Sequence, residues 1–237
     1  MAIITIRGQM GSGAPEIGRL IANKLQFDYV DREIIDKVAE LLQGPKHDIE
    51  MKEMPPGSLS RRILEALKRA YPSSRKVGLL PRWEYEGVSL PTWDIPLDDT
   101  RYLPALKSVI NDLAKIGSIV IRGRGSQFIL KDLPEAVHVL VVASNELRVK
   151  RVMENLKLGE GNAKKEIARF DSSRREFIKR YFNAELEDPL DYDLVINTNH
   201  LTFEDAAALV ITTSNFEGKA QHKGSDSLQW SHLYPRF

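Results

Sequence analysis

A glycine-rich turn between an apolar segment and an amphipathic segment constrains this chain most strongly. The apolar segment is Ala2–Ile6, and the turn runs from Gly8 to Gly13 with four residues between its outer glycines. This spacing between a strand and a helix is typical of a P-loop, whose backbone N–H groups and helix N-terminus surround a phosphate. The predicted phosphate-binding residues are Gly8, Gly11, Ser12, Gly13 and Ala14. The alternative is a strand-to-helix turn that binds no ligand.

The two residues after the turn differ from those of a standard P-loop. A lysine and a serine or threonine are expected there, but the chain has Ala14 and Pro15. The lysine normally contributes a positive charge and the hydroxyl a magnesium ligand. A hydrogen bond to a charged group is worth about 1.5–3 kcal/mol, so both losses oppose a standard ATPase. Glu16 adds a negative charge beside the turn, where stabilisation of the helix dipole is its simpler role.

Apolar runs alternate with amphipathic segments along the chain, a pattern typical of a parallel sheet covered by helices on both faces. Strands are predicted at residues 2–6, 27–30, 118–121, 137–142 and 194–196, and helices at 15–25, 31–42, 60–71, 103–115, 145–156, 162–181 and 202–211. Ser144 is the expected N-cap of one helix, and Thr202 with Asp205 the expected capping box of the last. The predicted fold class is therefore α/β.

Residues 44–100 differ in composition from the rest, with seven prolines. We interpret them as an insertion on the substrate side of one domain, residues 1–213, and residues 214–237 as a tail. The insertion contains Trp83, Tyr85 and Trp93. These aromatic side chains either stack on a base or partner, or pack against the core.

Composition excludes several classes of function. The net charge of +1 predicts no general attraction to nucleic acid or to a membrane surface, and the absence of cysteine excludes thiol catalysis. The five histidines show no metal-ligand spacing, so no protein metal cage is expected. Without a long apolar run or a basic leader, the chain is expected to be cytoplasmic. The sequence leaves open whether the chain forms a homodimer.

Several segments together resemble the cytidylate-kinase-like family of P-loop nucleoside-monophosphate kinases. They are Ile3–Ile6, Gly11–Gly18, Tyr29–Ile35, Gly123–Gly125, Val141–Arg151, Asp171–Arg174 and Tyr192–Thr198, within residues 1–212. The resemblance implies a three-layer P-loop NTPase fold, a monophosphate-binding insertion at 44–100 and a lid-like helical region at 154–183. It also implies phosphoryl transfer from ATP or another nucleoside triphosphate, with Mg²⁺, to CMP or a related monophosphate.

The resemblance also assigns site residues. Arg124 would contact the acceptor phosphate, and Arg169 and Arg174 would stabilise charge on the transferring phosphoryl group. The remaining nucleotide-contacting candidates are Asp31, Arg32 and Asp171. Each has a simpler alternative: a surface ion pair for Arg124, a solvated basic face for the helix arginines, an N-cap for Asp31, and a local pair between Asp171 and Arg174.

One departure from the family concerns Arg122. Cytidylate kinases have an aspartate before the Gly-Arg pair, whereas this chain has Arg122 before Gly123. Together with Ala14 and Pro15, this places magnesium-dependent catalysis in question. Two alternatives to a kinase follow: a non-catalytic nucleotide-binding sensor or regulatory protein, and a structural interaction module on a P-loop scaffold.

Overall fold

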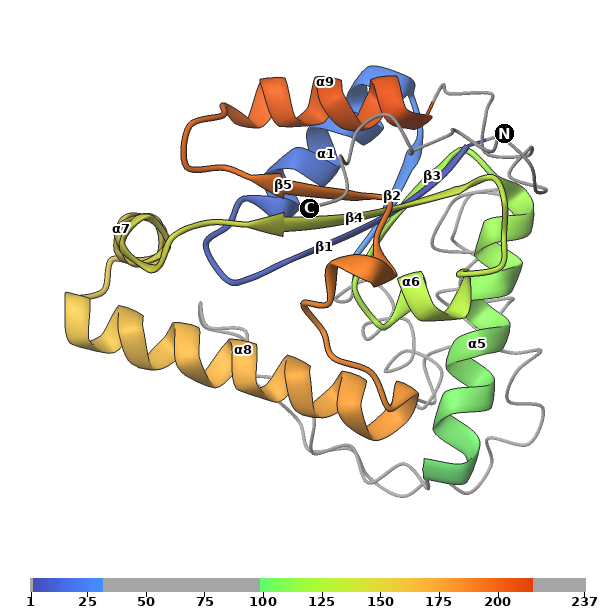
Figure 1. The fold of residues 1–237 in the computed structure, drawn as a ribbon, viewed down its shortest axis with the longest axis horizontal. Helices are drawn as coiled ribbons and strands as arrows, with labels where there is room; N and C mark the ends of the chain where they lie inside the picture. Colours follow the sequence, from blue (N-terminus) through green and yellow to red (C-terminus); the bar gives the residue numbers. More distant parts are fainter. Residues whose placement is uncertain (1, 32–98, 215–237) are drawn as a thin grey trace, which may run out of the picture.

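The computed structural model describes residues 2–31 and 99–214 (Figure 1). The strands are β1 (Ile3–Gly8), β2 (Asp28–Val30), β3 (Ile119–Arg122), β4 (Ala136–Val142) and β5 (Leu194–Asn197). The helices are α1 (Ala14–Leu25), α5 (Asp99–Ile116), α6 (Ser126–Ile129), α7 (Asn145–Leu156), α8 (Glu160–Phe182) and α9 (Phe203–Ser214), with a 3-10 turn at Pro189–Asp191. Arg32, the three insertion aromatics, the helix predicted at 60–71 and nearly all of the helix predicted at 31–42 lie outside the described residues.

The five strands form one parallel sheet in the order β2-β3-β1-β4-β5. In the central strand β1, Ile3 pairs with Ile119 of β3 and with Ala136 of β4. The chain continues from β3 on one side of β1 to β4 on the other. Ligands of open α/β sheets bind at the carboxyl edge where the strand order reverses, so this topology directs attention to the residues after β1.

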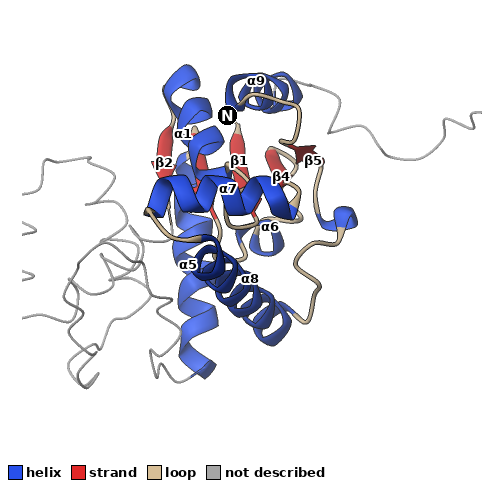
Figure 2. Ribbon diagram, turned by 90° about the vertical axis from the view of Figure 1, so that its left-hand side faces the viewer, coloured by secondary structure: helices blue, strands red, loops and turns tan. Residues whose placement is uncertain are grey.

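Two apolar clusters cover the two faces of the sheet. Successive side chains of β1 alternate: Ile4 and Ile6 pack with α1 and α9, whereas Ile3 faces α5. Figure 2 shows α1 and α9 on one side of the strands and α5, α6 and α8 on the other. The structure therefore confirms a three-layer α/β fold. By the same alternation Arg7 lies on the α5 face, at the carboxyl end of β1.

Most element positions agree with the predictions, and the helix caps agree closely. Ser144 Oγ accepts from the Leu147 N–H at the start of α7, and Thr202 Oγ1 accepts from the Asp205 N–H before α9. The predictions missed α6 and the 3-10 turn, because elements of four and three residues are too short to show a period. Helix α5 begins at Asp99, so the last two residues of the predicted insertion belong to this helix.

Helices α7 and α8 lie side by side next to the carboxyl ends of the strands (Figures 1 and 2). Val149 and Val152 of α7 pack with Ala163 and Ile167 of α8, and Met10 of the loop after β1 packs against this cluster. The helix pair is thereby fixed to the predicted phosphate loop. Within the described residues, no helix is long and apolar enough to span a membrane.

A phosphate loop and an arginine pocket as the candidate functional site

The turn from Gly8 to Gly13, here called the phosphate loop, has a backbone that requires glycine at two positions. Gly11 has a φ of +80° and Gly13 a φ of +97°, values that side chains rarely allow. A Cβ at Gly11 would also lie 2.8 Å from the Arg148 carbonyl oxygen, and one at Gly13 would overlap the Phe203 ring. The glycines thus shape the loop and let α7 and the first residue of α9 approach it closely.

The phosphate loop leaves several N–H groups unused at the N-terminus of α1. Within the described residues, those of Gly11, Gly13, Ala14 and Glu16 donate no hydrogen bond. Ser12 N–H donates to the Gln9 carbonyl oxygen at 3.1 Å, which closes the turn. Free N–H groups and the positive end of a helix dipole form a general anion site. The loop therefore keeps the backbone part of a phosphate-binding site.

Arg151 and Thr198 hold the carbonyl side of the phosphate loop. The Arg151 guanidinium donates to the carbonyl oxygens of Gly11 at 3.2 Å and Ser12 at 3.3 Å, and to Thr198 Oγ1 at 2.9 Å. Thr198 Oγ1 in turn donates to the Ser12 carbonyl oxygen at 2.8 Å. Burial lowers the pKa of Arg151, and the nearby Glu16 carboxylate opposes that shift. These contacts fix the carbonyl groups and add a positive charge beside the loop.

A second arginine of α7 contacts the loop at Met10. Arg148 Nε donates to the Met10 carbonyl oxygen at 2.8 Å, and its guanidinium forms a buried ion pair with Asp171 of α8. Asp171 Oδ1 accepts from the Met10 N–H at 3.0 Å. Asp171 was predicted to contact the nucleotide, with a local pair to Arg174 as the alternative. In the structure its two carboxylate oxygens bind the Met10 N–H and Arg148, and Arg174 is not among their partners.

Three further arginines line a small hollow, here called the arginine pocket. Arg7 comes from the end of β1, Arg124 from the turn after β3 and Arg174 from α8. Arg7 and Arg174 are only 8% and 9% exposed. The Arg174 guanidinium carbon lies 3.1 Å from the centre of the Phe170 ring. Arg124 and Arg174, two of the arginines to which the resemblance assigns a role, thus line the same hollow as Arg7.

Arg124 has an unusual backbone conformation. Its φ is +57°, between Gly123 at +78° and Gly125 at +68°. Left-handed conformations at non-glycine residues are uncommon and concentrate at functional sites. The turn is closed by Ser126 N–H, which donates to the Gly123 carbonyl oxygen at 3.1 Å. The half-buried Arg124 side chain is thereby held at the carboxyl edge of the sheet, where ligands bind.

Asp31 and Arg169 each form an ion pair in the structure. Arg122 donates to Asp31 Oδ2 at 3.0 Å, so the arginine that replaces the family aspartate is paired with the residue after β2. Arg169 pairs with Glu166 at 2.5 Å on α8 and is 39% exposed. It lies about 200° around α8 from Asp171, on the far side of the helix from the phosphate loop. The structure therefore does not bring Arg169 to the site.

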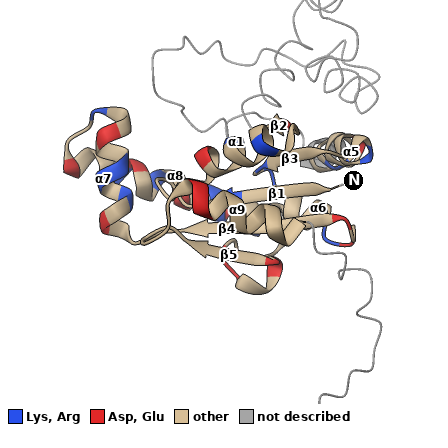
Figure 3. Ribbon diagram, turned by 90° about the horizontal axis from the view of Figure 1, so that it is seen from above, with Lys and Arg blue, Asp and Glu red and all other residues tan. Residues whose placement is uncertain are grey.

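The sequence analysis missed Arg7 and the contacts of Arg148 and Arg151. These arginines of α7 touch residues about 140 positions earlier, and no local period reports such contacts. A signal for Arg7 existed, because a charged residue at the inward position of an otherwise apolar strand is rare. On exposed surfaces, α7 has both signs of charge (Figure 3), which agrees with the balanced composition.

Metal-binding groups are sparse near the phosphate loop. Pro15 has no oxygen side chain, and the Arg122 position holds a cation bonded to Asp31. Ser12 Oγ is buried against Gly8 without a hydrogen-bond partner. Across residues 2–31 and 99–214, no three acidic, histidine or cysteine side chains gather closely enough to hold a metal ion.

Comparison with known proteins places the chain in a family. The model of the cytidylate kinase-like family matches residues 3–200, and the chain belongs to this family. A cytidylate kinase of Roseiflexus castenholzii is 23% identical over 230 residues, which are 89% of this chain and 92% of that protein. A uronate isomerase of Corynebacterium glutamicum is 31% identical over 104 residues, 44% of this chain, and the match spans only 20% of the isomerase.

A solved structure has the same fold. An uncharacterised protein from Eubacterium ventriosum superimposes with a TM-score of 0.61 at 18% identity, covering 91% of this chain and 99% of that one. Such identity shows the fold alone. With the family membership, the parallel sheet and the loop after β1, the chain has the three-layer α/β P-loop NTPase fold, and its function is nucleotide-kinase-like.

Proposed function

We propose that this protein binds a nucleoside triphosphate on the phosphate loop and transfers its terminal phosphoryl group to CMP or a related nucleoside monophosphate. The main supporting observation is the phosphate loop itself. It keeps four unused N–H groups at a helix N-terminus, although the lysine and hydroxyl of the motif are absent. Two arginines hold the carbonyl groups of this loop, and the unused N–H groups are left available for a ligand. This arrangement is expected of a loop that binds phosphate.

In the proposed reaction, an oxygen of the acceptor phosphate attacks the terminal phosphorus of the triphosphate. The bond between that phosphorus and the bridging oxygen breaks, and two nucleoside diphosphates leave. The phosphate loop would hold the donor phosphates, and Arg124 the acceptor phosphate. Arg174, from α8, would stabilise negative charge on the transferring group. Positioning and electrostatic stabilisation supply most of the catalysis in this reaction class.

Magnesium fits this site poorly. The family implies that Mg²⁺ accompanies the triphosphate, but Pro15 and Arg122 provide no oxygen ligand at the two positions that normally do so, and Ser12 Oγ is buried. We therefore assign no residue to the metal and no catalytic step to it. The positive charge next to the donor phosphates comes from Arg151 of α7, because Asp171 neutralises Arg148.

Isothermal titration calorimetry with ATP and with CMP, each with and without magnesium, tests this proposal. We expect micromolar binding of both nucleotides and ADP formation from ATP only when CMP is present. Binding without turnover would overturn the kinase and leave the nucleotide sensor. No binding of either nucleotide would overturn both and leave the interaction module.

A pair of glycine variants tests the role of the loop. In Gly11→Ala the new Cβ would lie 2.8 Å from the Arg148 carbonyl oxygen, so the loop must shift and ATP binding should weaken at least tenfold. Gly159→Ala is the matched control, since an added Cβ there meets no atom within 4 Å. Equal ATP affinity of the two variants would exclude the loop as the donor site.

A further inference from the structure

Arg7 carries a buried positive charge that has no hydrogen-bonded partner among residues 2–31 and 99–214. Its side chain is 8% exposed, and its Nε atom is buried with no hydrogen-bond partner. No hydrogen bond or ion pair links its guanidinium to another of the described residues. Buried arginines are normally paired, because removal of a charge from water is costly. Burial lowers the pKa of Arg7 to about 10, so the group is still charged at neutral pH.

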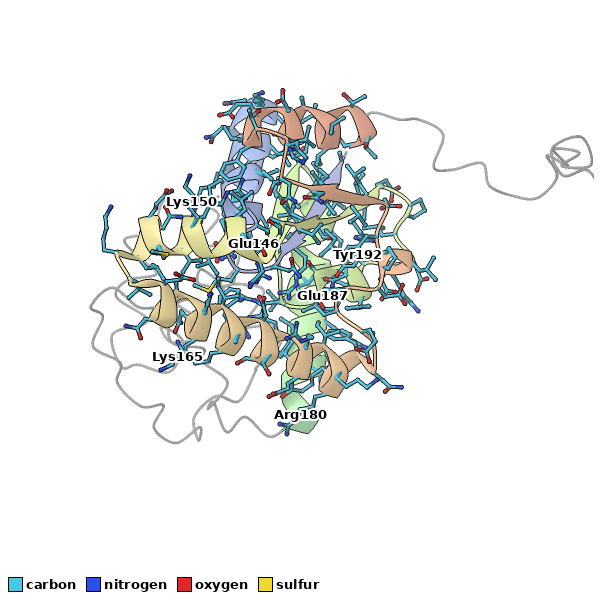
Figure 4. The ribbon with its side chains drawn as sticks, turned by 60° about the vertical axis from the view of Figure 1, so that its left-hand side comes forward. Glu146, Lys150, Lys165, Arg180, Glu187 and Tyr192 are labelled. Carbon is cyan, nitrogen blue, oxygen red and sulfur yellow. The ribbon has the colours of Figure 1, made fainter. Side chains whose placement is uncertain are left out.

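The groups that attract the charge of Arg7 already have other partners. Asp171, Glu187 and the hydroxyl of Tyr192 attract its charge, and Arg122 repels it. Asp171 is bound to Arg148 and to the Met10 N–H. Glu187 pairs with Arg175 at 3.4 Å, and Tyr192 Oη donates to the Leu186 carbonyl oxygen at 2.5 Å. Glu187 and Tyr192 come from the segment after α8 (Figure 4). None of these groups neutralises Arg7 directly.

The cavity beside Arg7 is also lined by two other arginines. Arg124 and Arg174 line the same hollow, along with Gly123, Gly125 and Gln127. Among these lining residues three are cations and none is an anion. Because Arg7 is buried and its guanidinium pairs with no other described residue, a ligand that carries negative charge is favoured beside it. The volume of this hollow, about 20 Å³, holds one water molecule, so a phosphate group fits only if the lining side chains move apart.

We propose that Arg7 binds a phosphate oxygen of the acceptor substrate and makes the arginine pocket selective for a phosphomonoester. This inference rests on the proposed function and extends it, because it names the residue that recognises the acceptor's charge. A dianionic phosphate has three terminal oxygens, and guanidinium groups bind such oxygens through paired N–H donors. Arg7 starts from the central strand of the sheet and is the least exposed of the three.

A functional role and a structural role for Arg7 predict opposite effects on stability. If Arg7 exists to bind a ligand, its replacement by an apolar side chain of similar length relieves a buried, unneutralised charge. Arg7→Met should then melt at the same or a higher temperature than the wild type. If Arg7 instead supports the fold through Asp171, Arg7→Met should melt lower. Residues that serve binding commonly make the folded protein less stable than an apolar replacement would.

The experiment compares wild type, Arg7→Met and Arg7→Lys, with Arg180→Met as the matched control. Arg180 is an exposed arginine near the end of α8 (Figure 4) and does not line the pocket. Calorimetry with CMP should show affinity lowered about 10- to 100-fold in Arg7→Met, less in Arg7→Lys, and unchanged in Arg180→Met. ATP affinity should change less than twofold in all variants. Cytidine, which has no phosphate, should bind each variant equally weakly.

Thermal unfolding in inorganic phosphate tests Arg7 even if the proposed function fails. Phosphate should raise the melting temperature of the wild type, and Arg7→Met should lose part of that rise. Unchanged CMP affinity with a lower melting temperature would overturn the proposal in favour of a structural charge. A wild type that binds ATP but shows no Arg7-dependent response to CMP or phosphate would overturn it and leave the loop intact. A wild type that responds to none of the three would overturn both.

Discussion

Arg148 and Asp171 form a buried ion pair that joins α7 to α8 and holds both polar atoms of the Met10 peptide in the phosphate loop. Arg148 binds the Met10 carbonyl oxygen, and Asp171 accepts from the Met10 N–H. One carboxylate therefore occupies an amide that a phosphate ligand would otherwise use. The loop is held in shape by an internal anion.

Asp171→Asn should destabilise the protein and strengthen anion binding at the loop. The substitution leaves the buried Arg148 without a counter-charge, at a cost of about 3 kcal/mol, or roughly 6–12 °C in melting temperature. It also removes a negative charge beside the bound phosphates, worth roughly fivefold in ATP affinity. Thermal unfolding and calorimetry measure the two effects. Glu160→Gln, which breaks an exposed pair with Lys164, is the control and should change neither.

A lower melting temperature combined with a higher ATP affinity would show that Asp171 stabilises the fold while it repels the bound phosphates. A variant that melts lower and also binds ATP more weakly would show that Asp171 contributes more through loop shape than through repulsion. A variant that melts at the wild-type temperature would mean that the ion pair contributes nothing net to stability.

Arg151→Met should loosen the phosphate loop from its carbonyl side. The variant loses donors to Gly11, Ser12 and Thr198, and we expect a loss of about 1–2 kcal/mol of stability because the guanidinium is only partly buried. ATP affinity should fall about tenfold, since the amides opposite those carbonyls are no longer held in place. Lys150→Met, at an exposed neighbouring position of α7, removes the same charge without touching the loop. Equal ATP affinity in both variants would contradict the role of Arg151.

The elements were predictable from the sequence because their signals are local. The period of apolar residues indicated α1 and α7, and Ser144 and Thr202 marked helix starts because capping depends on neighbours three residues apart. Their ends moved by a few residues, as with α5, which begins before its periodic segment. The glycine spacing indicated the phosphate loop for the same reason: its backbone geometry is encoded within six residues.

The partners of the loop were not predictable, because the fold brings them from distant positions. Arg148 and Arg151 lie one turn apart on α7, a helix with both acidic and basic side chains. In the sequence they look like Lys150, and only tertiary packing shows that they contact the loop whereas Lys150 faces solvent. Asp31 and Arg122 are 91 positions apart, and only the pairing of β2 with β3 makes them neighbours. For Arg169 the resemblance suggests a role at the site, whereas in the structure its side chain pairs with Glu166 on α8.

Glu16→Gln should increase affinity for ATP. Glu16 lies in the first turn of α1, next to the unused N–H groups, where a negative charge stabilises the helix but repels a bound phosphate. We expect a gain of about three- to fivefold in ATP affinity at low salt, with a loss of stability below about 1 kcal/mol. Calorimetry at low and at high ionic strength measures this gain in ATP affinity, because salt screening should diminish the difference between variant and wild type. A gain that persists unchanged at high salt would point to a cause other than charge.

Alkaline pH should destabilise the protein partly through Tyr192. Burial raises the pKa of Tyr192 to about 12, while Arg7 and the Gln127 amide partly oppose that shift. In the unfolded chain this hydroxyl ionises near pH 10, so between pH 10 and 12 the unfolded state binds fewer protons than the folded one. The stability that the neutral hydroxyl provides is therefore complete below pH 10 and is lost as the pH rises toward 12.

Tyr192→Phe tests this pH dependence. The variant loses its hydrogen bonds with Gln127 and Leu186, so at pH 7 it should be less stable by about 1–2 kcal/mol. Between pH 10 and 12 its stability should fall less steeply than that of the wild type. Urea unfolding at several pH values measures both slopes, and parallel curves would show that Tyr192 does not contribute to the alkaline transition.

Ala14→Lys combined with Pro15→Thr should increase phosphoryl transfer if the rest of the site is intact. The pair restores the charge and hydroxyl that the motif lacks, and the lysine begins directly at the unused N–H groups of the loop. Ala14 is 2% exposed and packs in the apolar cluster under α1, so the variant should melt lower without ligand and regain stability in ATP, whose phosphates neutralise the lysine.

Pro15→Thr alone is the control, because it restores only a hydroxyl. ADP production from ATP and CMP, measured for wild type, control and double variant, should increase at least tenfold only in the last. A double variant that regains stability in ATP but produces no ADP would mean that the acceptor side has lost its function, and the search for activity would then move to other acceptors with a phosphate group.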